Sequence, residues 1–389
     1  LSEQKTEIKC SSLSEDIEAT MRCLSSLGAS IEYQDGIISV TPIGEPTSDA
    51  VLDCGESGST YRFLAPVVAA LGVKASFLLR DRLSKRPMES LWDVLEKHGI
   101  TISGKGEEEV FLSGKLSGGI FKIEGDISSQ YISGLLMALP LLEEGGTIEI
   151  STPLESVGYI YITIDVLNSF GVTTEMNENS ICLNGKEKYI TPGHLVTEGD
   201  WSNSAFWLCG AAASGRSLTC TGLDVRSSQG DSAIIAVLRE MGADIECKDK
   251  SVYLKASFLR PAKINAGNIP DLVPAIALAA CSARGETEIF NAGRLRIKES
   301  DRLFTVADTL RELGAEIEER ETSLLIRGGN PLRGGCADSH GDHRIVMMAA
   351  LASLISKESI TIEGAEAVDK SYPGFFHDFA SLGAKIRKE

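Results

Sequence analysis

The spacing of apolar and polar positions changes period several times within residues 285–355. GETEIFNAG (285–293) alternates with a period of two, which predicts a strand. LFTVADTLRELG (303–314) has apolar residues at helical spacing and one polar face, which predicts an outer amphipathic helix. AEIEE (315–319) and TSLLIRG (322–328) predict two further strands. HRIVMMAALASLI (343–355) is apolar nearly all round, which predicts a second, buried helix.

The helix-to-strand junction of this segment, LRELGAEIEE (310–319), recurs along the whole chain. A glycine with positive φ can end such a helix, so each junction predicts a helix stop followed by a strand. The junctions lie 69 to 72 residues apart at Gly28, Gly99, Gly171, Gly242, Gly314 and Gly383. Six copies of one unit predict two domains of three copies each, residues 1–197 and 198–389, with the first copy incomplete.

Four more segments share the apolar character of residues 343–355. They are STYRFLAPVVAALG (59–72), SQYISGLLMALPLL (129–142), WSNSAFWLCGAAAS (201–214) and LVPAIALAACSARG (272–285). A helix without a polar face is expected to be buried, which places three such helices at the centre of each domain. If the helices of a domain run parallel, their positive ends meet at one face, and two such faces would form an anion-attracting cleft.

Composition narrows the classes of function. The net charge of −17 disfavours nucleic acid as a partner, because a phosphate-binding surface needs a basic stripe. The nine cysteines show no C-x-x-C spacing, which is typical of reduced thiols in a cytoplasmic protein. No signal peptide is recognisable, and the apolar runs are too short to span a membrane.

Basic residues collect in the loops before the predicted helices, although the chain as a whole is acidic. They are Arg62, Lys85, Arg86, Lys298, Arg302, His343, Arg344 and Lys370. Arginine binds carboxylate and phosphate in a bidentate manner, so these loops suggest a small anionic ligand. The alternative is that the Ser, Asp and Gly residues of the loops only cap helices. Neither a P-loop nor a dinucleotide fingerprint is present, and HGDH (340–343) has no second cluster to complete a metal site.

Several motifs in combination resemble a known family over the whole chain. They are GESGSTYRF, SKRP, SSQY, EGDWSNSAF, IPDLVP, RIKESDRL, GDHR and KSYPGF. They are similar to the EPSP synthases (3-phosphoshikimate 1-carboxyvinyltransferases), which are enolpyruvyl transferases of the shikimate pathway. The resemblance implies an α/β (α+β) fold of two domains. Each domain has three βαβαββ units around three buried parallel helices, and the active site lies in the cleft between the domains.

The resemblance also implies roles for individual residues, with neither cofactor nor metal. Contacts to phosphoenolpyruvate are expected from Gly58, Arg86, Gln130, Arg302, Arg344 and Lys370. Contacts to shikimate 3-phosphate are expected from Ser128, Ser129, Gln130, Ser156, Asp271 and Lys298. Arg62, Tyr159 and His343 are expected to line the site. Asp271 and Glu299 match the proton-transfer carboxylates of the family, and we assign Asp271 as the base and Glu299 as the acid, with a lysine as the rival acid.

Some positions depart from the family pattern. Arg294 stands where some members carry Asn, and Glu56 and Ser57 replace an Asn-Ala pair. Gly58 is kept, which predicts inhibition by glyphosate, because a side chain there would crowd the inhibitor. By the repeat period the first copy lacks roughly 40 residues, where the family carries a Lys-Ser pair and an Arg. The chain as given is therefore expected to bind and turn over poorly.

Two other functions are compatible with parts of the pattern. The related UDP-N-acetylglucosamine enolpyruvyltransferases carry a reactive cysteine in a mobile loop, but RLSKRPMES (82–90) contains no cysteine. A non-catalytic anion-binding protein could keep the fold, but the joint presence of Asp271, Lys298, Glu299 and Arg344 argues against it. We expect a cytoplasmic monomer that acts on small molecules.

Overall fold

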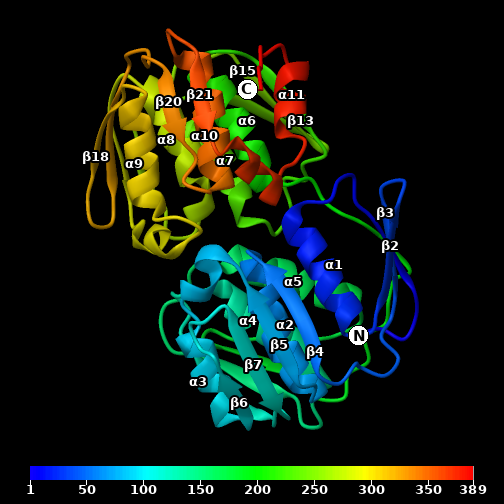
Figure 1. Ribbon diagram of the computed structural model, residues 1–389. Helices are drawn as coiled ribbons and strands as arrows, with labels where there is room; N and C mark the ends of the chain where they lie inside the picture. The colour runs from blue at the N-terminus through cyan, green and yellow to red at the C-terminus, as the bar shows by residue number, and fades with distance from the viewer. Residues whose placement is uncertain (389) are drawn as a thin grey trace. The chain divides into compact units, whose positions relative to one another are not determined.

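A computed structural model describes residues 1–388, which form two compact units. Unit 1 is Leu1–Thr197, and unit 2 begins at Glu198. Figure 1 shows the helices and strands of each unit in chain order. Each unit is built from small sheets that repeat one connection pattern.

The pattern is clearest in the middle of unit 1. Its elements are β4 (Ala50–Gly55), α2 (Gly58–Leu71), β5 (Ala75–Leu79), α3 (Glu89–Lys97), β6 (Ile100–Ser103) and β7 (Glu109–Gly114). The strand order is β4-β5-β7-β6, with β4 parallel to β5 and the other pairs antiparallel. The parallel pair follows from the helical crossover between its strands, whereas β6 and β7 form a hairpin.

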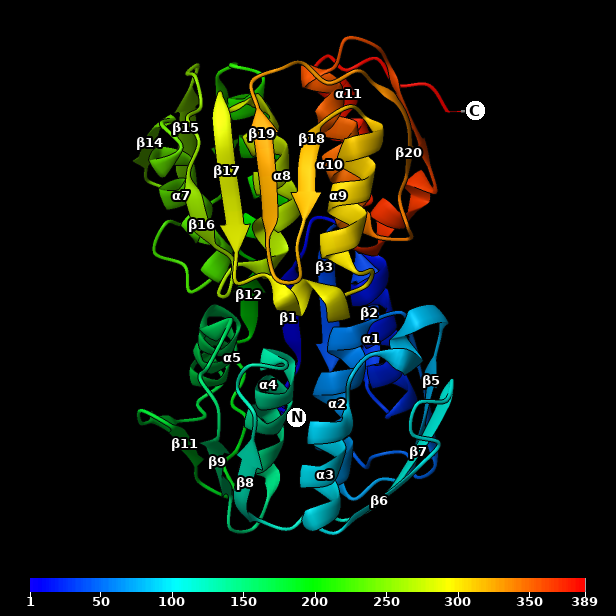
Figure 2. The same cartoon turned by 90° about the vertical axis from the view of Figure 1, so that its left-hand side faces the viewer.

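Two further sheets repeat this order. In unit 1 the elements are β8 (Gly119–Ile123), α4 (Ser129–Ala138), β9 (Gly146–Ile150), α5 (Val157–Ser169), β10 (Thr174–Met176) and β11 (Ser180–Leu183). In unit 2 they are β16 (Lys263–Asn265), α8 (Val273–Ser282), β17 (Gly285–Phe290), α9 (Arg302–Glu312), β18 (Glu316–Glu319) and β19 (Leu324–Gly328). Figure 2 shows β17, β19 and β18 side by side. These bounds agree with the strands and helices predicted for 285–328.

The other sheets contain part of the pattern, and one of them includes a strand that lies far away in the sequence. β1 (Thr6–Lys9), α1 (Glu15–Ser26), β2 (Ser30–Gln34) and β3 (Ile37–Thr41) precede β4. Here β12 (His194–Val196) pairs in parallel with β1 and takes the position that β4 has in its own sheet. The remaining elements of unit 2 are α6 (Trp201–Ala213), β13 (Leu218–Thr221), α7 (Ile234–Glu240), β14 (Asp244–Lys248), β15 (Ser251–Lys255), β20 (Gly335–Asp338), α10 (His343–Ala352), β21 (Ile360–Glu363) and α11 (Phe375–Ser381).

The six glycines of the repeat end helices as the sequence predicted. Their φ values lie between 79° and 108°, in the region that side chains disfavour. After Gly314, for example, the amide of Ala315 donates to the carbonyl of Leu310 at 2.8 Å, which closes the helix before β18 begins. Five of these glycines lead the chain from an outer helix into a hairpin. The strand predicted after Gly383 is not formed, because residues 384–388 have no regular secondary structure.

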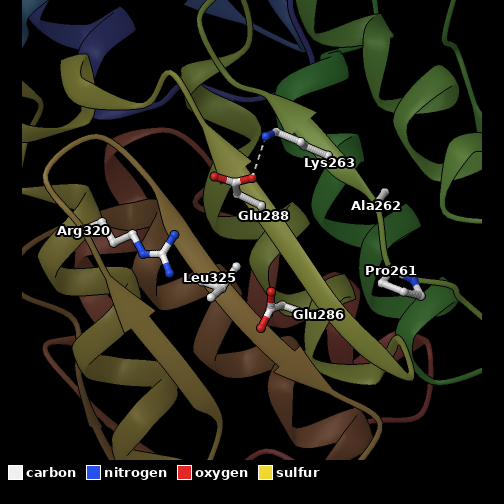
Figure 3. A pocket seen from close by; sticks show the side chains of 7 residues that line it. All are labelled: Pro261, Ala262, Lys263, Glu286, Glu288, Arg320 and Leu325. Atoms are coloured by element: carbon white, nitrogen blue, oxygen red, sulfur yellow. Dashed lines mark ion pairs between the residues drawn. The ribbon is translucent and has the colours of Figure 1, made fainter.

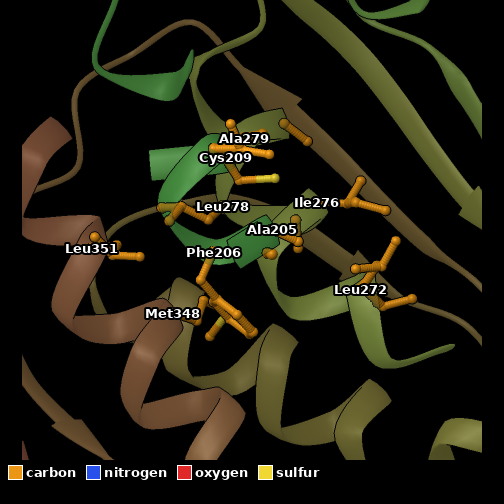
Figure 4. Close-up of a cluster of buried hydrophobic side chains, with 14 of the residues drawn as sticks. Ala205, Phe206, Cys209, Leu272, Ile276, Leu278, Ala279, Met348 and Leu351 are labelled. Carbon is orange, nitrogen blue, oxygen red and sulfur yellow. The ribbon is translucent and has the colours of Figure 1, made fainter. Parts of the chain in front are cut away.

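The core of each unit is formed by the helices that lack a polar face. In unit 2, α6, α8 and α10 pack on one another, and Figure 4 shows Phe206, Leu278 and Met348 of these helices meeting in one cluster. In unit 1, α2 packs against α4, and both are almost completely buried. Each fully buried Leu, Met or Phe contributes about 1.5–3 kcal/mol relative to an exposed one. The prediction that these helices are buried is confirmed. The third buried helix expected in unit 1 is not found among residues 1–197, because α1 and α5 each bury only one face.

None of the helices within residues 1–388 combines the length and the apolar character that crossing a membrane requires.

Candidate active site

The most densely charged part of unit 2 surrounds Arg302, the first residue of α9. Its side chain is 1% exposed and donates to three carboxylates. Nη1 lies 2.7 Å from Oδ1 of Asp271, Nη2 lies 2.6 Å from Oε2 of Glu299, and Nε lies 2.8 Å from Oδ2 of Asp342. Burial alone would lower the pKa of Arg302, but these carboxylates outweigh burial and raise it. The planar guanidinium fork can serve three partners at once, which a lysine cannot do with the same geometry.

Aspartate caps fix the starts of the two helices that carry Arg302 and Arg344. Asp301 caps α9 and accepts from the amide of Phe304 at 3.2 Å. Asp342 caps α10 and accepts from the amide of Arg344 at 3.0 Å and from the hydroxyl of Ser300 at 2.9 Å. An N-terminal aspartate satisfies amides that have no partner within the helix. The caps therefore fix both the starts of α9 and α10 and the direction in which their charged residues point.

Asp342 is a residue that the sequence analysis did not select. It is fully buried, and the pKa of its carboxyl is about 2. Burial by itself would raise that pKa, but Arg302 in particular lowers it, so Asp342 stays ionised. The motif GDHR drew attention to its His and Arg. The signal for Asp342 was the pattern of an N-cap aspartate directly before a helix.

Asp271 joins the basic residues of three segments. Besides its contact with Arg302, its Oδ1 lies 3.2 Å from Nζ of Lys298, and its Oδ2 lies 3.5 Å from Nη2 of Arg344. Arg344 also donates from Nη1 to the backbone carbonyl of Asp271 at 3.0 Å and to the hydroxyl of Ser202 at 2.6 Å. Burial alone would raise the pKa of Asp271, but Arg344, Lys298 and Arg302 hold it well below its usual range.

Lys298 and His343 are both shifted toward their neutral forms. Burial is the main reason that the pKa of Lys298 is lowered, although Asp271 opposes this. Burial also lowers the pKa of His343 to about 3, so its ring is neutral at physiological pH. Lys370 ends the short helix η7 (Ala365–Lys370), is 5% exposed, and lies on a segment that packs against α10.

Asp231 is a second residue that the sequence analysis missed. It lies in η3 (Gly230–Ala233), and only 3% of it is exposed. Burial, and then the nearby charge of Asp271, raises the pKa of Asp231 to about 6, while Arg344 and a hydrogen bond with Ser202 oppose the rise. The sequence carried no motif for this residue, because its relation to Asp271 is set by tertiary packing.

In unit 1, the predicted residues gather at the N-terminal end of α2. Nη1 of Arg62 donates to Oε1 of Gln130 at 2.9 Å, and Nη2 donates to the carbonyl of Pro87 at 3.4 Å. A Cβ at Gly58 would lie 2.9 Å from Nη1 of Arg62 and 2.9 Å from Nη1 of Arg86. Gly58 thus lets two guanidinium groups lie against the helix start. Gly58, Arg62, Arg86 and Gln130 are called the unit 1 group below.

Lys85 does not point the same way as its neighbour Arg86. Its side chain is exposed, and its Nζ donates to the carbonyl of Gly106 at 2.7 Å. Lys85 therefore holds the loop before α3 to the β6–β7 turn. The sequence instead suggested that Lys85 contacts an anion.

The predicted serines lie at helix starts in unit 1. Ser128 caps α4 and accepts from the amide of Gln130 at 3.3 Å, and Ser129 is buried beside it. Ser156 precedes α5 with a φ of 56°, a left-handed conformation that costs a non-glycine residue about 1–3 kcal/mol. Its carbonyl accepts from the amide of Tyr159 at 3.2 Å. Strain of this kind is often kept where a side chain must face a ligand.

A separate hollow lies on the sheet of β16, β17 and β19, away from the charged cluster. It is lined by Pro261, Ala262, Lys263, Glu286, Glu288, Arg320 and Leu325 (Figure 3). Lys263 pairs with Glu288 at 2.9 Å across it. None of the residues predicted for the site lines this hollow.

Replacing Asp231 by Asn should change how the stability of the protein depends on pH. The pKa of Asp231 is higher in the folded chain than in the unfolded chain. The stability that its protonated carboxyl contributes is therefore present at low pH and is lost as pH rises through about 6. Asp231→Asn should therefore raise the free energy of unfolding by about 2–3 kcal/mol at pH 8 and by almost nothing at pH 4. Urea unfolding at both pH values measures this. Exposed Asp244→Asn is the control, and an Asp231→Asn effect equal at both pH values would contradict the assignment.

Comparison with known proteins places the chain in one family. The family model "EPSP synthase (3-phosphoshikimate 1-carboxyvinyltransferase)" matches residues 1–379. The 3-phosphoshikimate 1-carboxyvinyltransferase of Clostridium kluyveri is 42% identical over 380 residues, which are 96% of this chain and 88% of that protein. The enzyme of the same name from Clostridium perfringens is 41% identical over 394 residues, covering 100% of this chain and 92% of its own.

Solved structures agree with the sequence relatives. The structure of EPSP synthase from Acinetobacter baumannii has a TM-score of 0.83 and 28% identity, and the match covers 100% of this chain and 92% of that chain. The mixed α/β fold and the family expected from the motifs are confirmed. The chain belongs to the EPSP synthase family of 3-phosphoshikimate 1-carboxyvinyltransferases.

Proposed function

We propose that the chain transfers the enolpyruvyl group of phosphoenolpyruvate to the 5-hydroxyl of shikimate 3-phosphate, in the biosynthesis of chorismate and aromatic amino acids. Family membership supports this reaction. The observation that carries it to this chain is the cluster in which Arg302 joins Asp271 and Glu299. Carboxylates for proton transfer and cations for anionic substrates thus occur together, as an addition-elimination reaction requires.

The reaction has two steps, and neither needs a redox group. In the first, the 5-hydroxyl oxygen bonds to the enol carbon of phosphoenolpyruvate, the hydroxyl gives up its proton, and the methylene carbon gains one to become a methyl group. In the second, the methyl group loses a proton, the carbon–oxygen bond to phosphate breaks, and the double bond returns. A positioned acid or base contributes about 10²–10⁴-fold to the rate of such a step.

Asp271 is assigned as the base and Glu299 as the acid. Asp271 is ionised, as a base must be, although three cations hold its pKa low. Substrate anions that draw Arg344 or Lys298 away would raise the basicity of Asp271. Glu299 contacts Arg302 through one oxygen, and its side chain is 17% exposed. Lys298 is the rival acid, because burial lowers its pKa and makes its proton easier to give.

The unit 1 group is assigned to the anionic parts of the substrates. Arg86, Gly58 and Gln130 are proposed to contact phosphoenolpyruvate, with Arg344 and Lys370 of unit 2. Arg302 could contact it only if one of its carboxylates turned away, because its side chain is 1% exposed. Shikimate 3-phosphate is proposed to bind Ser128, Ser129, Gln130, Ser156, Asp271 and Lys298, with Arg62, Tyr159 and His343 in supporting positions.

Other properties of the protein stay predictions from the sequence. They include a monomeric state and a cytoplasmic location. A non-catalytic anion-binding protein remains the alternative from another class, and it would bind the two substrates without releasing phosphate.

Substitution of the two carboxylates tests the assigned roles. Asp271→Asn and Glu299→Gln should each reduce phosphate release from shikimate 3-phosphate and phosphoenolpyruvate by about 10²–10⁴-fold, because each removes one proton-transfer group. Steady-state assays of phosphate measure this loss. Asp244→Asn and Glu318→Gln, both at exposed positions, are the matched controls and should keep wild-type rates. A Glu299→Gln enzyme with the wild-type rate would move the acid role to Lys298.

Glyphosate should inhibit the enzyme at micromolar concentration, and Gly58→Ala should relieve the inhibition. The added methyl group would come within 2.9 Å of Nη1 of both Arg62 and Arg86, so the guanidinium groups must shift. Inhibition curves against phosphoenolpyruvate for the two proteins measure this. Insensitivity of the unmodified protein at millimolar glyphosate would contradict the prediction.

A further inference from the structure

The thiols of Cys23 and Cys54 form a close buried pair in unit 1. Their Sγ atoms lie 3.9 Å apart, and both residues are fully buried. Cys23 belongs to α1, and Cys54 is near the end of β4, 31 positions later. Two thiols that packing brings this close from separate elements can be joined once their sulfur atoms approach to bonding distance. Arg22, Ser25 and Ser26 of α1 are exposed, so one helix separates the pair from solvent.

The pair lies directly before the loop that starts α2. The amide of Ser57 donates to the carbonyl of Cys54 at 2.9 Å, and Ser57 then caps α2. Gly55, with a φ of 55°, makes the turn between them. Gly58 follows at the first position of the helix. The backbone of Cys54 is therefore part of the structure that places the unit 1 group.

A second contact ties α1 to the same helix start. The hydroxyls of Thr20 and Thr60 lie 2.7 Å apart, and Thr60 also donates to the hydroxyl of Ser57 at 2.8 Å. Thr20 precedes Cys23 by three positions, so both side chains lie on the face of α1 that covers β4 and α2. A movement of α1 toward β4 would consequently displace Ser57 and Thr60.

We propose that Cys23 and Cys54 are an oxidisable dithiol, which a small peroxide converts to a disulfide, and that this bond displaces the Cys54–Gly58 loop. An S–S bond is about 2 Å long, so the two sulfur atoms must approach each other by a similar distance. The loop then carries Gly58 away from its position against Arg62 and Arg86. The formation of the disulfide is independent of the proposed function, whereas its effect on catalysis rests on it.

The chemistry assigns different roles to the two sulfurs. The hydrogen bond with Cys54 is the main reason that the pKa of Cys23 is lowered, and the same bond raises the pKa of Cys54. The Cys23 thiolate attacks one peroxide oxygen, the O–O bond breaks, and hydroxide departs. Cys23 then carries a sulfenic acid. The Cys54 sulfur then attacks the Cys23 sulfur, and the S–O bond breaks. The two cysteines lose two electrons and two protons, and the peroxide becomes two molecules of water.

Peptide mapping of the full chain after treatment with hydrogen peroxide tests the proposal. A peptide that links Cys23 to Cys54 should appear, with the mass of two hydrogens lost, and dithiothreitol should remove the link. Cys54→Ser should abolish it, and Cys23→Ser should do the same if the first variant does not fold. Cys209→Ser, which removes a buried thiol of unit 2, is the matched control and should leave the link intact.

Amide hydrogen exchange tests the displacement of the loop without assuming any activity. Exchange of the Ser57 and Tyr61 amides should become about tenfold faster in the oxidised protein and return to normal after reduction. Phosphate release should fall by about ten- to a hundredfold in parallel. Failure to form the link while the exposed Cys336 is oxidised would overturn the proposal, and so would a link that leaves exchange unchanged. Absence of phosphate release from the untreated protein would contradict the proposed function and leave the thiol result to be judged by mapping and exchange.

Discussion

The contact of one buried guanidinium with three carboxylates organises the charged cluster of unit 2. Arg302 lies within 2.8 Å of oxygens of Asp271, Glu299 and Asp342, and these come from three different segments. Removing an ion from water costs several kcal/mol, and only close opposite charges with good geometry offset that cost. The segments are thus held in one arrangement, because displacing any of them would remove one of the three contacts that offset the burial of the Arg302 charge.

The ion pairs around Arg302, together with burial, account for the pKa shifts nearby. Asp271, Glu299 and Asp342 face Arg302, Lys298 and Arg344, which gives three acids and three bases. Asp231 is a further carboxyl beside this balanced set, and its pKa rises to about 6 because burial penalises its charge. A substrate phosphate that bound here would contact cations that are already paired with carboxylates. In the proposed reaction, substrate binding at this cluster would redistribute existing ion pairs and so change the basicity of Asp271 only when substrate is present.

The sequence was sufficient for those parts of the fold that depend on local chemistry. Gly314 and its five counterparts have positive φ because a helix must stop there, and α8 is buried because it has no polar face. The sequence could not show that β12 pairs with β1, since that pairing joins residues more than 180 positions apart. It also could not show that Arg302 is surrounded by carboxylates. Asp342 and Asp231 were missed because their importance comes from what lies beside them in space.

The direct test of the central role of Arg302 is the free energy of unfolding of Arg302→Gln, measured in urea beside Arg320→Gln. Arg320 pairs with Glu318 on the surface, where both side chains are about half exposed. The buried cluster predicts a loss of about 3–5 kcal/mol for Arg302→Gln, because three carboxylates lose their shared partner. The surface pair predicts a loss of about 0–1 kcal/mol for Arg320→Gln. Equal losses in the two variants would contradict the view that the structure depends on this cluster.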